Sequence, residues 1–362
     1  MHSTALSDLR EAVSERVVTA LDDRTAHLAH VGAPLTDFLA PARSLLGGGK
    51  RLRALLCGAG WAAAAPGAAL EGPVVLAGSA LELFQGAALV HDDVMDASQT
   101  RRGMPSAHRR FALEHAERGW LGDADDYGQA SAIVLGDLLL SLSSMEMDEA
   151  QAAVGSEAGG RARRTYDAMT AEVALGQYLD IRSQAQPWED DGDTALARAL
   201  QVVRHKSARY SVEHPMLVGA ALAGAEDGLL AALSAVGLPL GEAFQLRDDE
   251  LGVFGDPSTT GKPAGDDLRE GKRTALLAMT MRRAGADDRA LLRGRVGAAD
   301  LTGDEVATLQ QIMRATGAVE EHERMIEQRY EVGLAALTTA ALPESADALL
   351  RELAAALTRR AA

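Results

Sequence analysis

Three carboxylates at the end of an apolar run are the first candidates for chemistry. The segment Ala88 to Asp96, A-L-V-H-D-D-V-M-D, contains no lysine or arginine. Asp92 and Asp96 are four residues apart, so on a helix they share one face while Asp93 is rotated away. Like charges roughly 4 Å apart repel by about 4 kcal/mol at an effective dielectric of about 20. A hard cation such as Mg²⁺, which takes oxygen ligands and often bridges to phosphate, would relieve that repulsion. The competing interpretation is a helix end in solvent.

A second acidic pair follows another apolar run. The segment 245–252, Q-L-R-D-D-E-L-G, repeats the adjacent pair with Asp248 and Asp249. The position four after Asp248 is Gly252 rather than an acid. The loop that follows is rich in glycine and carries the lysines Lys262 and Lys272. These lysines would be able to close over a ligand, and their place behind a second acidic helix end strengthens that prediction.

Basic segments complete the pattern. Arg101 and Arg102 follow the first acidic end, and arginine clamps phosphate oxygens well. The segment 47–53, G-G-G-K-R-L-R, is not a nucleotide P-loop, because Ser44 stands where the first glycine of that motif belongs. Its three cations begin a predicted helix, where backbone N–H groups also favour anions; they are Lys50, Arg51 and Arg53. The alternative for this segment is a solvated basic turn.

A further polar pair, Lys206 and Ser207, interrupts a helical run within H-K-S-A-R-Y-S. Together, two acidic helix ends with cations nearby describe a multi-metal Mg²⁺ site that holds one diphosphate, beside a basic site for a second. An apolar cavity between the two would exclude water. This arrangement fits carbocation chemistry, in which metal ions stabilise a departing diphosphate.

Helices are the elements that must position these residues. Only 4% of the 362 residues are aromatic, and alanine and leucine dominate a composition that is 47% hydrophobic, which favours helices over strands. Because no strand-like alternation, internal repeat or long linker interrupts the chain, we expect one all-α domain over 1–362, with a flexible tail at 1–10. The predicted helices cover 5–40, 52–64, 73–96, 127–152, 161–184, 194–208, 210–223, 226–235, 238–251, 273–284, 304–317 and 319–340.

Charge and cysteine content bound the partners and the compartment. A net charge of −16 repels nucleic acid and anionic lipid, so neither is expected as a general partner. The single Cys57 excludes an intrachain disulfide and suits a reducing compartment. The N-terminus lacks the pattern of a signal peptide, and the uncharged run 54–70 contains Pro66 and is a poor membrane span. We therefore expect a cytoplasmic protein without stable membrane insertion.

In its motifs the chain resembles the trans-isoprenyl diphosphate synthases, the polyprenyl synthetase family, over about residues 40–275. Five motifs occur in the family's order, which makes the resemblance specific. They are G-G-K-R-x-R at Gly48–Arg53, D-D-x-x-D with R-R-G at Asp92–Gly103, G-Q-x-x-D at Gly176–Asp180, the K-[TS] pair at Lys206–Ser207, and F-Q-x-x-D-D with G-K-x-x-G-x-D-L-x-x-G-K-x-T at Phe244–Thr274.

The resemblance implies an all-α isoprenoid synthase fold, a single large helical bundle around a central cavity, which usually forms a homodimer. It implies that isopentenyl diphosphate condenses with an allylic diphosphate by ionisation, condensation and elimination, with about three Mg²⁺ ions. The implied metal ligands are Asp92, Asp96 and Asp248, supported by Asp93 and Asp249. The implied ligands of the allylic diphosphate are Arg101, Lys206, Ser207, Gln245, Lys262 and Lys272. The implied ligands of isopentenyl diphosphate are Lys50, Arg53, Gln85 and Arg102.

Three positions depart from the family pattern. Gly252 replaces the usual last aspartate of the second acidic motif, which weakens catalysis unless Asp248 is the main ligand there. Ser207 stands where threonine is usual and keeps the hydroxyl. Ala54 replaces a common proline.

Rival functions remain open. A class I terpene cyclase also uses D-D-x-x-D, but its second motif normally begins with asparagine, and this chain contains no asparagine. A class II cyclase needs D-x-D-D, and Asp123–Asp126 matches, but in an acidic loop that we interpret as solvated surface. A non-catalytic subunit of a heteromeric synthase tends to lose the acids, whereas this chain keeps both adjacent pairs.

Residues below the first acidic motif would set the product length. Ala88 and Ala87, four and five residues before Asp92, are small, where fifteen-carbon synthases usually carry a bulky residue. Phe84 lies about two helical turns below Asp92 and would form a deeper floor. We therefore predict geranylgeranyl diphosphate (C20), with longer chains (C25 or more) and farnesyl diphosphate as alternatives.

Overall fold

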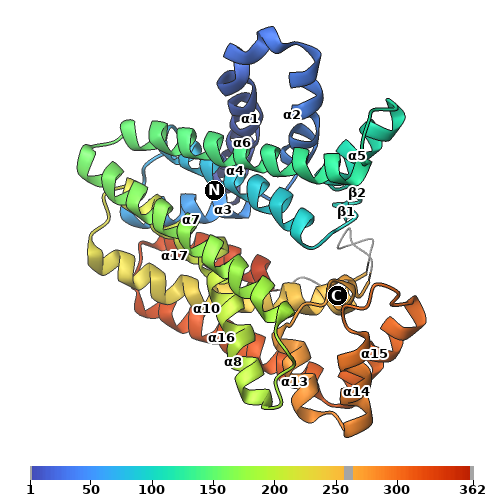
Figure 1. Ribbon diagram of the computed structural model, residues 1–362. Coiled ribbons are helices and arrows are strands. Elements are labelled where there is room, and N and C mark those ends of the chain that lie inside the picture. The colour runs from blue at the N-terminus through green and yellow to red at the C-terminus, as the bar shows by residue number, and fades with distance from the viewer. Residues whose placement is uncertain (1, 257–263, 359–362) are drawn as a thin grey trace. The chain divides into compact units, whose positions relative to one another are not determined.

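A computed structural model describes residues 2–256 and 264–358 of the chain, and most of them are helical (Figure 1). The helices of the first half are α1 (His2–Thr25), the 3₁₀-helix η1 (Ala26–Val31), α2 (Ala33–Leu46), α3 (Leu52–Ala64), α4 (Pro73–Met95), α5 (Ala107–Glu117), α6 (Ala124–Ala152) and α7 (Ser156–Ala185). Those of the second half are α8 (Gly192–Val202), the π-helix η2 (Val203–Glu213), α9 (His214–Leu222), α10 (Asp227–Phe254), α12 (Asp266–Glu270), α13 (Ala275–Arg283), α14 (Ala286–Arg295), α15 (Gly303–Ala315), α16 (Ala318–Thr339) and α17 (Glu344–Thr358).

The chain divides into two compact units, and the single domain over 1–362 stays a prediction. Unit 1 comprises residues 1–166, 215–230 and 343–350, and unit 2 comprises 167–214, 231–342 and 351–362. The all-α class predicted from composition is confirmed, since the strands in the described ranges are the two-residue pair β1 (Thr100–Arg101) and β2 (Met104–Pro105).

The core of unit 1 is built around α4, which runs beside α6 and also packs against α1 and α3 (Figure 1). Because α4 is apolar on nearly every side before His91, it is buried on several faces at once. Small residues allow the close approach: a Cβ at Gly78 would lie 3.0 Å from that of Ala54 on α3. The last turn of α4, which carries the acidic motif, is therefore held by a fully packed helix.

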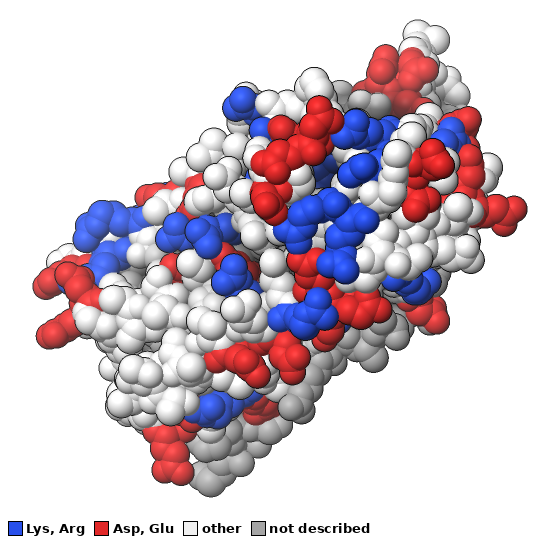
Figure 2. Space-filling view, turned by 90° about the horizontal axis from the view of Figure 1, so that it is seen from below, with Lys and Arg blue, Asp and Glu red and all other residues white. Residues whose placement is uncertain are grey.

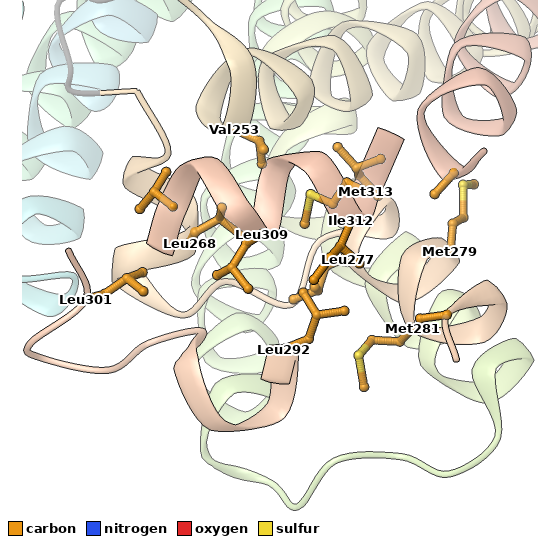
Figure 3. Packing of buried hydrophobic residues seen from close by; sticks show 14 residues of the cluster. Val253, Leu268, Leu277, Met279, Met281, Leu292, Leu301, Leu309, Ile312 and Met313 are labelled. Carbon is orange, nitrogen blue, oxygen red and sulfur yellow. The ribbon is translucent and has the colours of Figure 1, made fainter. Parts of the chain in front are cut away.

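Unit 2 has its own apolar cluster, shown in Figure 3. Leu276, Leu277 and Met279 of α13 pack with Leu309 and other side chains of α15. The cluster also includes Leu268 of α12, which is 1% exposed. The short helix α12 is therefore fixed to this core. The packing places α12 firmly enough to orient the charged residues on it.

Several element predictions differ from the structure. Residues 2–10, predicted as a flexible tail, instead form the start of α1, because Leu6 and Leu9 are buried. The helices α5, α14 and α17 have no counterpart among the predicted ranges, and α10 continues through Pro239, where the sequence indicated two helices. α5 and α14 carry several charges each, which masks their apolar faces in a simple periodicity analysis.

Within the described ranges, α4, α6 and α10 are long and apolar enough to cross a membrane by length and composition. Their most apolar windows are 67%, 44% and 50% buried inside the protein. For α4 in particular, the apolar surface already has an internal partner, so composition alone does not decide its environment. The absence of membrane insertion stays a prediction.

The close contact between α3 and α9 in unit 1 generates a stability prediction. A Cβ at Gly60 would lie 2.0 Å from the backbone oxygen of Met216, which cannot rotate away. We expect Gly60→Ala to lower the free energy of unfolding by about 1–3 kcal/mol, as overpacking does. The matched control is Gly228→Ala in α10, where nothing lies within 4 Å. Urea denaturation followed by circular dichroism measures both, and equal effects would contradict the packing described.

Candidate active site

The first acidic motif lies at the C-terminal end of α4. Asp92 and Asp93 occupy its last turn, and Asp96 is its C-cap residue. The end of a helix dipole at this terminus is negative, so it adds to the mutual repulsion of the carboxylates. Asp93 is 2% exposed, whereas Asp92 and Asp96 are half-buried. A cation beside Asp92 and Asp96 would offset both effects.

A β-hairpin returns one cation to this helix end. β1 pairs with β2 in antiparallel register, and the turn between them has Arg102 and Gly103 at positive φ. The hairpin thereby folds Arg101 back onto α4, where its Nε donates to Asp93 Oδ1 at 3.0 Å. A terminal nitrogen of Arg101 also lies 4.0 Å from Asp92 Oδ2. Arg101 thus holds Asp93 and lies beside the predicted metal ligand.

The next arginine, Arg102, joins the β1–β2 hairpin to the basic segment 47–53. Arg102 Nη1 donates to the carbonyl oxygens of Leu45 and Gly48 at 2.9 and 2.8 Å. Gly49, with φ of +121°, lets the guanidinium approach, since a Cβ there would lie 3.2 Å from Arg102 Nη2. Burial lowers the pKa of Arg102, and the positive charges of Arg51 and its neighbours add to that effect. The structure therefore brings Arg102 and the G-G-G-K loop together, as a second anion site requires.

The three cations of that loop differ in position. Lys50 is exposed and Arg53 half-buried, whereas Arg51 is 3% exposed and points inward. Arg51 lies 3.5 Å from Glu82 Oε2, so its charge is compensated inside unit 1. The N–H of Ala54 donates to the other oxygen of Glu82 at 3.5 Å, a bond that the family's usual proline lacks the hydrogen to make. Gln85, the remaining predicted ligand of this group, is half-buried on α4.

Below the acidic end, α4 carries the predicted floor residues. Ala87 is fully buried and Ala88 partly exposed, and Phe84 is 5% exposed. The ring of Phe84 meets that of Tyr166 edge to face, with centroids 6.4 Å apart. The Tyr166 hydroxyl bonds to Ser143 Oγ on α6, which also donates to a carbonyl of α4. The sequence analysis missed Tyr166, which lies outside every motif.

In unit 2, the helices α7 and η2 bring two motifs together. Asp180, the last residue of G-Q-x-x-D, lies 2.6 Å from Lys206 Nζ, and both side chains are largely buried. The approach depends on Gly176, since a Cβ there would lie 2.3 Å from the backbone nitrogen of Lys206. Lys206 and Ser207 sit in the π-helix η2, a form that often marks functional sites.

A glutamate on α7 anchors the same π-helix. Glu172 accepts from His205 Nδ1 at 2.6 Å and from Arg209 at 3.1 Å, and it lies 3.1 Å from His214 Nε2. Burial lowers the pKa of His214. These contacts hold residues on either side of Lys206, so the orientation of the π-helix is fixed independently of the Lys206 ammonium.

The second acidic pair lies near the C-terminal end of α10. Gln245 Nε2 donates to Asp249 Oδ1 at 2.8 Å, and Asp248 is half-buried. Burial raises the pKa of Asp249 well above its usual range, and the charge of Asp267 raises it further. Asp248 is the more solvent-accessible carboxylate of the pair and the better placed to bind a cation.

The segment that follows the glycine- and lysine-rich loop of unit 2 returns to α10. Lys272 Nζ lies 2.6 Å from Glu270 Oε2 and 3.7 Å from Asp267 Oδ1. The carboxylate of Asp267 lies against α10 at Gly252, where a Cβ would be 2.1 Å from its Oδ2. Lys262 lies outside the described residues.

The donor chemistry suits Mg²⁺. Carboxylate oxygens are the ligands this ion prefers, and Asp92 and Asp96 present them from one helix end. Across residues 2–256 and 264–358, no three side chains of the His, Cys, Asp and Glu type group as a ready-made metal cage.

The D-x-D-D segment has a structural role. Asp123 is the N-cap of α6, and its side chain accepts from the backbone N–H groups of Asp125 and Asp126. Asp125 also pairs with Arg109. All three acids are exposed, and their position at the positive end of the helix dipole is favourable without any ligand.

One cavity in unit 2, of about 110 Å³, contains none of the predicted site residues. It is lined by α8, α13, α14 and the α7–α8 loop, and Arg273 stacks there over Trp188 at 3.3 Å from the ring centroid. On the face that Figure 2 shows, Lys and Arg side chains gather in groups between acidic ones, although the chain carries a net charge of −16.

Comparison with known proteins establishes the family. The sequence model described as polyprenyl synthetase matches residues 36–313, most of the chain. The chain therefore belongs to the polyprenyl synthetase family, and it is a trans-prenyltransferase. The resemblance inferred from the five motifs is confirmed.

Relatives with different products match at similar levels. Geranylfarnesyl diphosphate synthase of Aeropyrum pernix is 33% identical over 239 residues, 66% of this chain and 68% of that protein. The (2E,6E)-farnesyl diphosphate synthase of Mycobacterium tuberculosis is 32% identical over 296 residues, 81% of this chain and 74% of that protein. The crystal structure of Corynebacterium glutamicum geranylgeranyl pyrophosphate synthase, complexed with isoprenyl diphosphate and magnesium, is 39% identical with a TM-score of 0.91 and covers 98% of this chain and 99% of that one. The similarity to these relatives therefore does not fix the length of the prenyl product.

The buried pair of Lys206 and Asp180 gives a prediction for unit 2. We expect Asp180→Asn to lower the free energy of unfolding by about 2 kcal/mol, because it leaves a largely buried ammonium without its charged acceptor. The control is Asp190→Asn, which removes the exposed partner of Arg293 and should change stability by less than about 1 kcal/mol. Thermal unfolding by calorimetry compares them. Equal stabilities of the two variants would show that the Lys206 pair contributes nothing.

Proposed function

We propose that this trans-prenyltransferase condenses isopentenyl diphosphate with an allylic diphosphate in the presence of Mg²⁺. The observation that carries the proposal is the placement of Asp92 and Asp96 at the negative end of α4, beside Arg101. Carboxylates in that position gain from a divalent cation and from the diphosphate that the cation bridges. When bound, Mg²⁺ would neutralise the charge that develops on the departing diphosphate.

The side chains divide into three groups in this proposal. Asp92, Asp96 and Asp248 would hold about three Mg²⁺ ions, and the basic loop would hold the second substrate. Lys50, Arg53, Gln85 and Arg102 form the latter group, in which Arg102 is already bound to the loop at Gly48. Arg101, Lys206, Gln245 and Lys272 would bind and orient the allylic diphosphate.

Lys206 and Ser207 would stabilise the allylic cation as well as its diphosphate. Lys206 is held by Asp180, and the π-helix around it is anchored through Glu172. Fixed dipoles and charges lower the barrier because they need no reorganisation as the C–O bond breaks. The proton lost after condensation would pass to the departing diphosphate.

We further propose that the main product is geranylgeranyl diphosphate. The support is the small pair Ala87 and Ala88 above Phe84, together with the buried contact of Phe84 with Tyr166. Mass spectrometry of the dephosphorylated products tests this, and mainly farnesol would contradict it. We also propose a cytoplasmic homodimer, which sedimentation and cell fractionation test.

The second candidate, a class I terpene cyclase, has less support. Cyclases have no second diphosphate site, whereas Arg102 and the G-G-G-K loop form one cationic group here. The alternative that the protein is a non-catalytic subunit is tested with the purified protein alone. If it forms no product when given Mg²⁺ and both substrates, that alternative is favoured.

The first acidic motif yields a prediction for metal dependence. Asp92→Asn and Asp96→Asn should each lower kcat/KM by about 10²–10³, since each would remove a ligand of the Mg²⁺ that stabilises the transition state. The Mg²⁺ concentration needed for half-maximal activity should rise in both variants. Asp126→Asn, which alters an equally acidic helix end, is the control and should leave both unchanged. Loss of activity in Asp126→Asn instead would favour the class II cyclase.

The floor of the product cavity yields a second prediction. Phe84→Ala should lengthen the products by about one isoprene unit, because such a unit is roughly one helical turn long. Ala87→Phe should shorten them by placing a ring nearer Asp92. Mass spectrometry of the dephosphorylated products measures the product length of both variants. Ala153→Phe, at the end of α6 and not on α4, is the control. Unchanged lengths in the first two variants would place the floor elsewhere.

A further inference from the structure

The cavity of unit 2, between α8, α13, α14 and the α7–α8 loop, has a cationic lining. Five arginines and two carboxylates line it, an excess of three positive charges in a chain whose net charge is −16. The arginines are Arg198, Arg273, Arg282, Arg289 and Arg293, and the acids are Glu189 and Asp190. The sign of this site is therefore opposite to that of the protein.

Two of the arginines have no acidic partner. The other three are paired: Arg198 with Glu189 at 2.5 Å, Arg282 with Asp193 at 2.7 Å and Arg293 with Asp190 at 2.9 Å, each from nitrogen to oxygen. In the part of the chain that the structure describes, no carboxylate pairs with Arg273 or with the exposed Arg289. Burial lowers the pKa of Arg273, and no nearby acid offsets that effect. Both guanidinium groups are thus available to an anion.

The plane of the Arg273 guanidinium is fixed by Trp188. The guanidinium carbon Cζ lies 3.3 Å from the ring centroid, so the two groups are in contact. A stacked guanidinium keeps its N–H donors at its edge, where they bind a carboxylate or a phosphate. The next residue, Thr274, is the N-cap of α13, and its hydroxyl accepts from the N–H of Leu277 at 3.2 Å. Arg273 is therefore held in a geometry that can bind an anion without rearrangement.

Much of the remaining lining is apolar. Leu277 and Met281 of α13, both labelled in Figure 3, are 2% and 8% exposed, and α8 contributes the small side chains of Ala195 and Ala199. The cavity has a volume of about 110 Å³. Since an apolar cavity of about 150 Å³ takes a molecule the size of benzene, this one admits a body of about five carbon atoms.

We propose that this cavity binds a small organic anion, with a carboxylate or phosphate head on Arg273 and Arg289 and a compact body of about five carbon atoms against α8 and α13. None of the residues assigned to the metal ions or to the two diphosphates lines this cavity in the described part of the chain. The site is therefore additional to the proposed active site, and binding there is measured without turnover.

Two ligands with the same five-carbon skeleton test the proposal and distinguish the head groups. 3-Methylbutanoate carries a carboxylate, and isopentenyl phosphate carries a phosphate. Acetate supplies the head alone, and 3-methylbutanol supplies the body alone. Calorimetry on the full chain at constant ionic strength measures each Kd. Tryptophan fluorescence locates the ligand, because a signal that disappears in Trp188→Phe arises from this cavity.

At least one of the two five-carbon anions should bind with a Kd of about 1 mM, as a ligand of this size does. Acetate should bind at least about 10-fold more weakly, since each buried methylene strengthens binding about fourfold. Arg273→Gln should weaken binding by about 10-fold or more, because a charge-assisted hydrogen bond is lost. The anion that binds more tightly identifies the head group.

Arg283→Gln is the matched control, because Arg283 lies on the same helix but does not line the cavity. It should bind as the wild type does. Ala195→Leu keeps Arg273 and fills the cavity, so it should weaken binding of 3-methylbutanoate and not of acetate. This variant carries the test if thermal unfolding shows that Arg273→Gln does not fold.

Three results would overturn the inference. They are no saturable binding of either five-carbon anion, equally tight binding of 3-methylbutanol, and binding that is unchanged in both Arg273→Gln and Ala195→Leu. Each of them would leave the proposed prenyl transfer intact, since that reaction uses other residues.

Discussion

Carboxylates at the negative ends of apolar helices are the constraint on which the structure depends. Asp92, Asp93 and Asp96 end α4, and Asp248 and Asp249 lie in the last turns of α10. Each group combines mutual repulsion with an unfavourable helix dipole. Unit 1 offsets part of this cost with Arg101, which the β1–β2 hairpin returns to Asp93. In the proposed function, a cation and its diphosphate would offset the rest of this repulsion, so the arrangement suits binding rather than stability.

Close helix packing makes that arrangement possible. α4 and α3 approach at Gly78, and α7 approaches η2 at Gly176, so the helices that carry charged residues are held rigidly. Three of the cationic side chains have a partner within their own unit. Asp180 pairs with Lys206, Glu82 lies beside Arg51, and carbonyl oxygens of the segment 45–48 accept from Arg102. In the proposed reaction, charges preorganised in this way would lower the barrier without moving as the bond breaks.

The sequence was sufficient for the helical class, the family and most motif positions, because apolar periodicity and motif order are local properties. It was not sufficient for contacts between distant segments. The pairing of Asp180 with Lys206, the contact of Tyr166 with Phe84 and the π-helical form of η2 depend on tertiary packing. Gly252 is another case: the sequence indicates only a lost ligand, whereas the structure shows that the carboxylate of Asp267 packs against α10 at this glycine. Charged helices such as α5 and α14 were missed because their apolar faces are narrow.

The most direct test of the account is to locate the cations. Crystals grown with Mn²⁺ and inorganic diphosphate would show the ions by anomalous scattering. The account predicts peaks bound by Asp92 and Asp96 and by Asp248, each bridged to diphosphate oxygens. Peaks absent from both acidic helix ends, with diphosphate bound elsewhere, would contradict it.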